Sequence, residues 1–216
     1  MIKTISIPNY SLQEELINSI SHGLAAALSI AGLVLLSIKA SSDGALAVTS
    51  VTIFGTTMIL LYTMSCIYHG LSPRCKGKKV MRVLDHCNVF LLVFGTIIPV
   101  SLIGIGGAQG WVCFSIVAFI TIIGIVASSI NIDKVKVIEV ICHLINGWGV
   151  LIYTKALLNN IGSIGLLFII LGGVMYSLGA IFYGLGSKKK YVHSIFHFFC
   201  IFGTLLHFFA IYFYIL

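Results

Sequence analysis

Two histidines, His193 and His197, stand four residues apart in the stretch YVHSIFHFF, directly after three consecutive lysines. Residues four apart on an α-helix lie on the same face, so both imidazoles can point toward one ion. Neutral imidazole nitrogens are common ligands of zinc, which predicts a metal site. The spacing also fits a second interpretation, in which histidines at a membrane interface bridge helices or contact lipid head groups.

A third candidate ligand, His69, ends another apolar stretch in the motif SCIYHG. Three imidazoles leave the fourth position of a tetrahedral zinc ion open, which is typical of catalytic sites. Ser65 precedes His69 by four residues and therefore shares its helical face. Asp85 opens the next apolar stretch, and we expect both Asp85 and Ser65 to hydrogen-bond the zinc-bound water or to orient a ligand.

The composition indicates the kind of protein that positions these residues. The chain has 216 residues, of which 59% are hydrophobic and 9% charged, and its mean hydropathy is +1.10. A soluble domain carries about a quarter of charged residues, so this chain cannot cover a soluble surface. We therefore expect an all-α polytopic protein of the cell membrane. Its net charge of +7 is interpreted as a topology signal rather than as a sign of nucleic-acid binding.

Seven stretches are long and apolar enough to cross a bilayer as helices, since a crossing needs about 20 residues. They cover roughly 18–38, 46–68, 83–105, 110–130, 137–153, 164–185 and 193–216. We expect one seven-helix transmembrane domain over residues 1–216, with a short polar segment at 1–17. Pro99 is expected to kink the third crossing.

The lysines and arginines orient this bundle. Eleven fall on the side that holds the N-terminus and the second, fourth and sixth loops: Lys3, Arg74, Lys76, Lys78, Lys79, Arg82, Lys134, Lys136, Lys188, Lys189 and Lys190. Only Lys39 and Lys155 fall on the other side. Because basic loops stay in the cytoplasm, the N-terminus is predicted inside and the C-terminus outside.

This orientation places the candidate residues at one depth. The second crossing ends at the cytoplasmic face, where the third and seventh begin, so His69, Asp85 and His193 lie level. The first crossing adds Glu15, Asn18 and His22 at that level.

The other histidines receive different interpretations. We expect His22 and His143 to act in packing or hydrogen bonding, and His207 to be structural. His86 and Cys87 are a weak rival ligand pair, because adjacent helical residues point about 100° apart.

The motifs together resemble the hemolysin III family, the bacterial branch of the progestin and adipoQ receptor family. The family pattern has E-x2-N-x3-H in the first crossing, S-x3-H ending the second, an aspartate opening the third and H-x3-H in the seventh. Glu15, Asn18 and His22 match the first motif. The others are matched by Ser65 with His69, by Asp85, and by His193 with His197. Cys142 and His143 are not required by the pattern.

The resemblance implies zinc held by His69, His193 and His197, with Asp85 and Ser65 around the metal-bound water. It also places the chain near membrane metal-hydrolases such as the alkaline ceramidases. The leading hypothesis is a zinc-dependent hydrolase of a membrane lipid amide or ester, with Asp85 accepting the proton of water. The alternatives are a zinc-stabilised sensor or receptor affecting lipid homeostasis and a membrane-perturbing cytolytic protein. A pore is disfavoured, because the outer halves of the crossings are almost wholly apolar.

Overall fold

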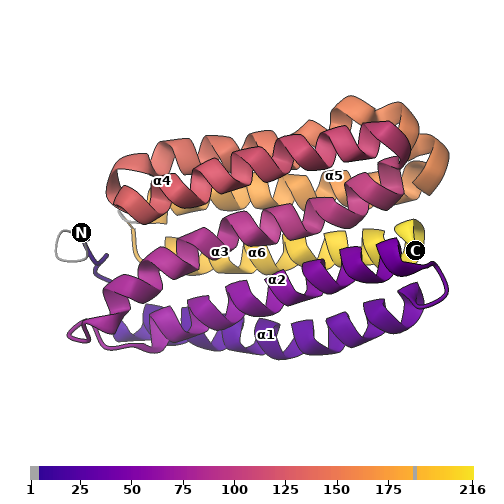
Figure 1. Cartoon of the computed structure of the whole chain (residues 1–216). Helices are drawn as coiled ribbons and strands as arrows, with labels where there is room; N and C mark the ends of the chain where they lie inside the picture. The colour runs from indigo at the N-terminus through magenta and orange to yellow at the C-terminus, as the bar shows by residue number, and fades with distance from the viewer. Residues whose placement is uncertain (1–4, 187–188) are drawn as a thin grey trace.

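The described part of the chain, residues 5–186 and 189–216 of a computed structural model, folds into helices alone. The helices form an elongated bundle whose axes run roughly along one direction, with the two chain ends at opposite ends of it (Figure 1). Along the chain they are α1 (Leu12–Ala40), α2 (Ala45–Gly70), α3 (Gly77–Pro99), α4 (Gly107–Trp148), α5 (Thr154–Gly186) and α6 (Val192–Ala210).

The helix α1 begins before the predicted first crossing. Ser11 caps it: its hydroxyl accepts a hydrogen bond from the Glu14 backbone N–H, while the Glu14 carboxylate accepts one from the Ser11 backbone. This reciprocal arrangement satisfies two backbone donors and fixes where the helix starts. The expected polar segment 1–17 therefore ends in helix, and Glu14 and Glu15 are buried.

The third predicted crossing changes its helix type at Pro99. α3 ends at Pro99, and a π-helical turn, η2, continues over Val100–Ile105. Proline lacks the N–H that an α-helix needs at this point, which accounts for the change. The chain then reverses at Gly106, whose φ of 71° favours glycine.

α4 is 42 residues long and folds back on itself. As one straight helix it would measure about 63 Å, roughly twice the hydrocarbon core of a bilayer. Asn131 interrupts it with φ −157° and ψ 85°. Asn146 donates to Thr121 at 3.3 Å, although a straight helix would hold these residues about 37 Å apart. The two arms therefore lie against each other, as Figure 1 shows.

The final elements continue the bundle without a long loop. A 3₁₀ turn, η3 (Gly149–Tyr153), joins α4 to α5, which has a non-helical residue at Gly162. A π-helical turn, η4 (Ile211–Ile215), follows α6. α6 packs against α5 and α1, and α2 packs between α1 and α3.

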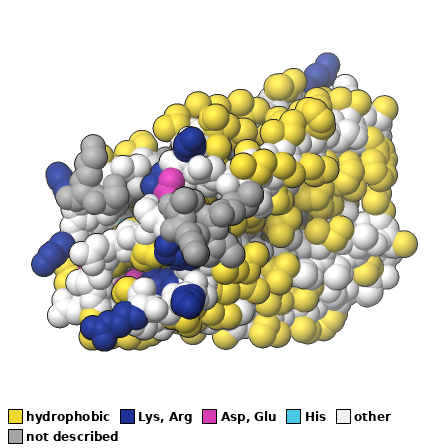
Figure 2. Space-filling view, turned by 60° about the vertical axis from the view of Figure 1, so that its left-hand side comes forward, with side chains coloured by type: hydrophobic (Ala, Val, Ile, Leu, Met, Phe, Trp, Pro, Cys, Tyr) yellow, Lys and Arg dark blue, Asp and Glu magenta, His cyan; other side chains and the backbone are white. Residues whose placement is uncertain are grey.

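The surface is that of a protein in lipid. Within the described residues, five helices are long and apolar enough to cross a membrane. Figure 2 shows apolar side chains over much of the molecular surface, with lysine and arginine concentrated toward one end. An all-helical, polytopic membrane protein is the architecture that fits. The seven crossings and their orientation stay predictions, and two of the counted lysines, Lys3 and Lys188, lie outside the described residues.

Candidate metal centre

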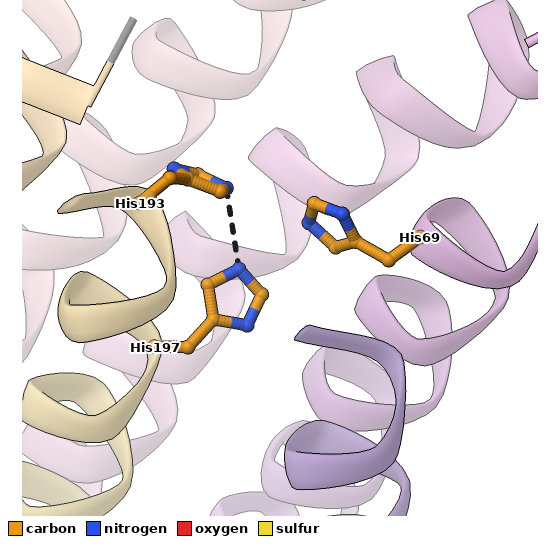
Figure 3. Close-up of side chains that lie close together, drawn as sticks. All are labelled: His69, His193 and His197. Carbon is orange, nitrogen blue, oxygen red and sulfur yellow. Dashed lines mark hydrogen bonds between the residues drawn. The ribbon is translucent and has the colours of Figure 1, made fainter. Parts of the chain in front are cut away.

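Three imidazoles meet between α2 and α6. His69 lies in the last turn of α2, while His193 and His197 occupy the first two turns of α6, and their rings point toward one another (Figure 3). The Nε2 atoms of His193 and His197 are 3.2 Å apart. The ring of His69 lies 4.8 Å from that of His197 and 5.3 Å from that of His193, measured between centroids. All three residues are buried.

The donor atoms fit a single metal ion. One nitrogen from each histidine lies within 4.8 Å of the other two. Ligands about 2.0–2.1 Å from a tetrahedral zinc ion are about 3.3 Å apart, so small side-chain rotations bring all three to that spacing. Nε2 of His69 is buried without a hydrogen-bond partner. Buried polar nitrogens normally have partners, and an ion would supply one for this atom. This group could therefore hold a metal.

A carboxylate orients one of the three rings. Oε2 of Glu15 lies 2.6 Å from Nδ1 of His69, and Oε1 of the same carboxylate accepts a hydrogen bond from Lys78 Nζ at 2.6 Å. Because the carboxylate accepts, Nδ1 of His69 carries the proton and Nε2 presents a lone pair. This is the usual arrangement for a metal-ligating histidine. Asn18 adds a contact of 3.4 Å to the same Nδ1.

Asp85 and Ser65 lie on a cavity of about 140 Å³ that His193 and His197 also line. Most other lining residues are apolar, among them Leu61, Leu92 and Ile97. The structure therefore brings a carboxylate, a hydroxyl and two of the three imidazoles to one small chamber inside the bundle.

The segment before α1 covers the centre. Tyr10 stacks on His193 with ring centroids 4.8 Å apart and an angle of 12° between the planes. Burial raises the pKa of the Tyr10 hydroxyl well above its ordinary value, so this ring stays neutral. Ser6, earlier in the same segment, is held by Asp133: its N–H and its hydroxyl donate to the Asp133 carboxylate at 3.0 and 2.9 Å. Arg82 donates both to the Ser6 carbonyl and to Asp133.

The comparisons with known proteins bear on this arrangement. A family model described as "Haemolysin-III related" matches residues 10–208. "Hemolysin-3" of Bacillus cereus is 36% identical over 206 residues, covering 95% of this chain and 93% of its own. The "Hemolysin-3 homolog" of Bacillus subtilis (strain 168) is 34% identical over 206 residues, covering 95% and 96%. The chain belongs to the haemolysin III family. With its apolar helices, it is a multi-pass protein of the cell membrane.

The remaining histidines of this haemolysin III protein are not members of the three-histidine group, although they line the same cavity. His22 packs on His197 at 3.9 Å and against the edge of Tyr62, and both of its nitrogens are unpartnered. His207 contacts the Gly203 carbonyl at 3.0 Å through Nδ1. His86 and Cys87 point to different partners, Glu139 and Ser129, so they do not form a ligand pair.

Several residues around the centre escaped the sequence argument. Lys78 is fully buried against Glu15, although its lysine-rich surroundings suggest a solvated loop. Tyr10 and Asp133 lie outside the seven predicted crossings, so the hydropathy pattern did not mark them. Glu139 could have been found from the sequence, because an ionisable residue inside a predicted crossing is costly and marks a candidate functional site.

Proposed function

We propose that this haemolysin III protein is a zinc-dependent hydrolase that cleaves an amide or ester bond of a membrane lipid. The observation that carries the proposal is a group of three buried imidazoles, two of which share a cavity with Asp85 and Ser65. A structural zinc site would use four protein ligands, whereas three leave a position for chemistry. Zinc would activate a water molecule and polarise the carbonyl group of the substrate when bound.

The protein groups divide the remaining tasks. Asp85 accepts the proton of the attacking water, a role that a carboxylate performs when it lies beside the reacting atoms. Ser65 lies on the same cavity and supplies a hydroxyl that orients the attacking water or the Asp85 carboxylate. Glu15 keeps the proton of His69 on Nδ1, away from the centre. The Tyr10 ring, stacked on His193, limits the access of bulk water to the centre.

A lipid is the substrate class that suits the surroundings. The cavity lies within helices whose outward faces are apolar, and most of the surface that lines it is apolar as well. An acyl chain can occupy such a chamber without the cost of burying unpaired polar atoms. A water-soluble substrate would need many more hydrogen-bonding partners than the lining offers.

We further propose seven crossings with the N-terminus in the cytoplasm. The folded-back α4 supports this count, since its two arms together with α1, α2, α3, α5 and α6 give seven passes. The opposite positions of the chain ends in Figure 1 agree with an odd number of passes. The basic end of Figure 2 then faces the cytoplasm and places the centre near the inner leaflet.

The test combines metal analysis and lipid chemistry on one preparation. Detergent-purified protein should contain about one zinc per chain and release a new product from membrane lipid extracts, detected by mass spectrometry. His193→Ala and His197→Ala should lose most of both.

His207→Ala is the matched control, because it removes a buried imidazole from the same helix about 21 Å from His193 and should retain zinc. Zinc without any lipid product would favour the sensor interpretation. Zinc retained in both ligand variants would contradict the site itself. Lysis of cells, which the name of the relatives suggests, would not separate a hydrolase from a cytolysin.

A further inference from the structure

A second polar group faces the same cavity from α3 and the second arm of α4. Glu139 is buried, with one oxygen 3.2 Å from Nδ1 of His86 and the other bonded to the Ser128 hydroxyl. His143 follows Glu139 by four residues and therefore shares its helical face. His86, Glu139 and His143 all line the cavity together with His193 and His197.

The carboxylate determines what His86 offers to this cavity. Glu139 accepts a hydrogen bond from Nδ1 of His86, so the proton of a neutral imidazole lies on Nδ1. Its Nε2 then carries a lone pair, and the ring cannot rotate without breaking the bond to Glu139. His86 thus presents a fixed hydrogen-bond acceptor.

His143 leaves a second hydrogen-bonding atom unmatched. Its Nδ1 is buried and has no partner, while its ring packs on Phe90 at 4.0 Å between centroids. An unpaired buried polar atom destabilises the protein, so a ligand that satisfies it binds more tightly for that reason. If this polar group served only to link α3 to α4, the bond between His86 and Glu139 would be enough, and His143 would have no role.

We propose that His86, Glu139 and His143 form a polar subsite that binds a hydroxyl group on the head of the lipid. A hydroxyl donates its single hydrogen to the fixed acceptor of His86 and accepts a hydrogen bond from a protonated Nδ1 of His143, because it is at once a donor and an acceptor. The inference rests on the proposed function only in taking the ligand to be a lipid. It specifies the head group and requires no cleavage.

Trp148 gives a direct measurement of occupancy. The protein has two tryptophans; Trp148 lines the cavity and Trp111 lies on the surface, so Trp111→Phe leaves one reporter inside. Two ether probes carry the same brominated alkyl chain, which quenches nearby tryptophan. One is the glycerol monoether and the other the methyl ether, and neither contains a bond that a hydrolase could cleave.

The subsite predicts a preference that its variants lose. In the Trp111→Phe protein the glycerol ether should quench Trp148 with about tenfold higher affinity than the methyl ether, as one or two hydrogen bonds to a buried site provide. Glu139→Gln and His143→Phe should each reduce this preference to about threefold or less. The second variant retains an aromatic ring beside Phe90, so it tests the subsite even if the first disturbs the fold.

Thr96→Val is the control, because Thr96 also lines the cavity but already donates to the Leu92 carbonyl. It should retain the tenfold preference. Equal affinity of the two ethers, a preference that survives in both subsite variants, or no quenching by either probe would overturn the proposal. A normal preference in protein that releases no lipid product would retain the subsite and reject the hydrolase.

Discussion

Asp85 lines the cavity with His193 and His197 but is not part of the three-histidine group, so in the proposed hydrolase a change of Asp85 separates catalysis from metal binding. Asp85→Asn should retain most of the zinc, because the imidazole group is intact. Lipid turnover should nevertheless fall by about 10²–10⁴-fold, the usual contribution of a general base. Zinc content and product release on the same preparation measure both effects.

Ser65→Ala serves as the graded comparison, since a hydroxyl on the same cavity assists without itself taking the proton. Its loss of turnover should be smaller than that of Asp85→Asn. An Asp85→Asn protein that retains zinc and the full rate would show that the carboxylate has only a structural role.

Glu15 connects the metal centre to a buried charge. Glu15→Gln removes the anion that orients His69 and should weaken zinc affinity by about 10–100-fold, measured by competition with a chelator. It also leaves the Lys78 ammonium buried without its partner, which costs about 3–5 kcal/mol of stability.

Lys78→Met in the same chain separates the two effects. The double variant should regain thermal stability and still bind zinc weakly, because only the charge problem is repaired. If the double variant also regained normal zinc affinity, Glu15 would act through Lys78 rather than through His69.

The helical spacing in the sequence was enough to select the candidate metal ligands. It could not predict the side chains that hold them in place. His193 and His197 share a face by helical geometry, and Ser65 shares one with His69. The pairing of Glu15 with His69 depends on how α1 crosses α2, which no local pattern contains. Lys78 was counted as a topology signal because neighbouring lysines surround it in the sequence.

At the scale of elements, the segment before α1 is held by an ion pair between α3 and α4. Asp133→Asn weakens the bonds from Ser6 and Arg82, so amide hydrogens of residues 5–10 should exchange about 10–100-fold faster. Hydrogen–deuterium exchange with mass spectrometry measures this rate. The same variant should release zinc to a chelator faster, since Tyr10 lies over His193.

Lys136→Ala is the comparison for that experiment. Lys136 also pairs with Asp133, at 3.5 Å, but its side chain is 43% exposed, and such surface pairs contribute about 0–1 kcal/mol. Its exchange rates should match those of the unchanged protein. Unaltered exchange in Asp133→Asn would mean that Tyr10 alone holds the segment.

The helices themselves could be predicted from apolar lengths, whereas their ends could not. The predicted crossing at 46–68 differs by at most two residues at each end from α2, and the one at 83–105 ends with η2 but begins six residues after the start of α3. The start of α1 was missed by six residues, because the capping pair of Ser11 and Glu14 extends the helix beyond its apolar run. The fold-back at Asn131 falls between the two crossings that hydropathy separates.

At the scale of the whole molecule, the charge distribution predicts the orientation of the protein in the membrane. The fold does not test this prediction. A periplasm-active reporter fused after Leu216 should be active, and the same reporter between Gly70 and Gly77 should be silent. A cytoplasm-active reporter should give the opposite pair of results. Activity outside the cytoplasm at the second position would reverse the bundle and move the centre to the outer leaflet.

The candidate metal centre combines residues from α1 and α2 with residues from α6, so its parts are synthesised at different times. Glu15 and His69 leave the ribosome early, whereas His193 follows His69 by roughly 120 residues, about 6–25 s later at usual synthesis rates. Until α6 inserts, the nascent protein has only one imidazole of the three-histidine group. In the proposed zinc protein the ion is therefore captured only in the final step of biogenesis, and a chain that stops before α6 should reach the membrane without metal.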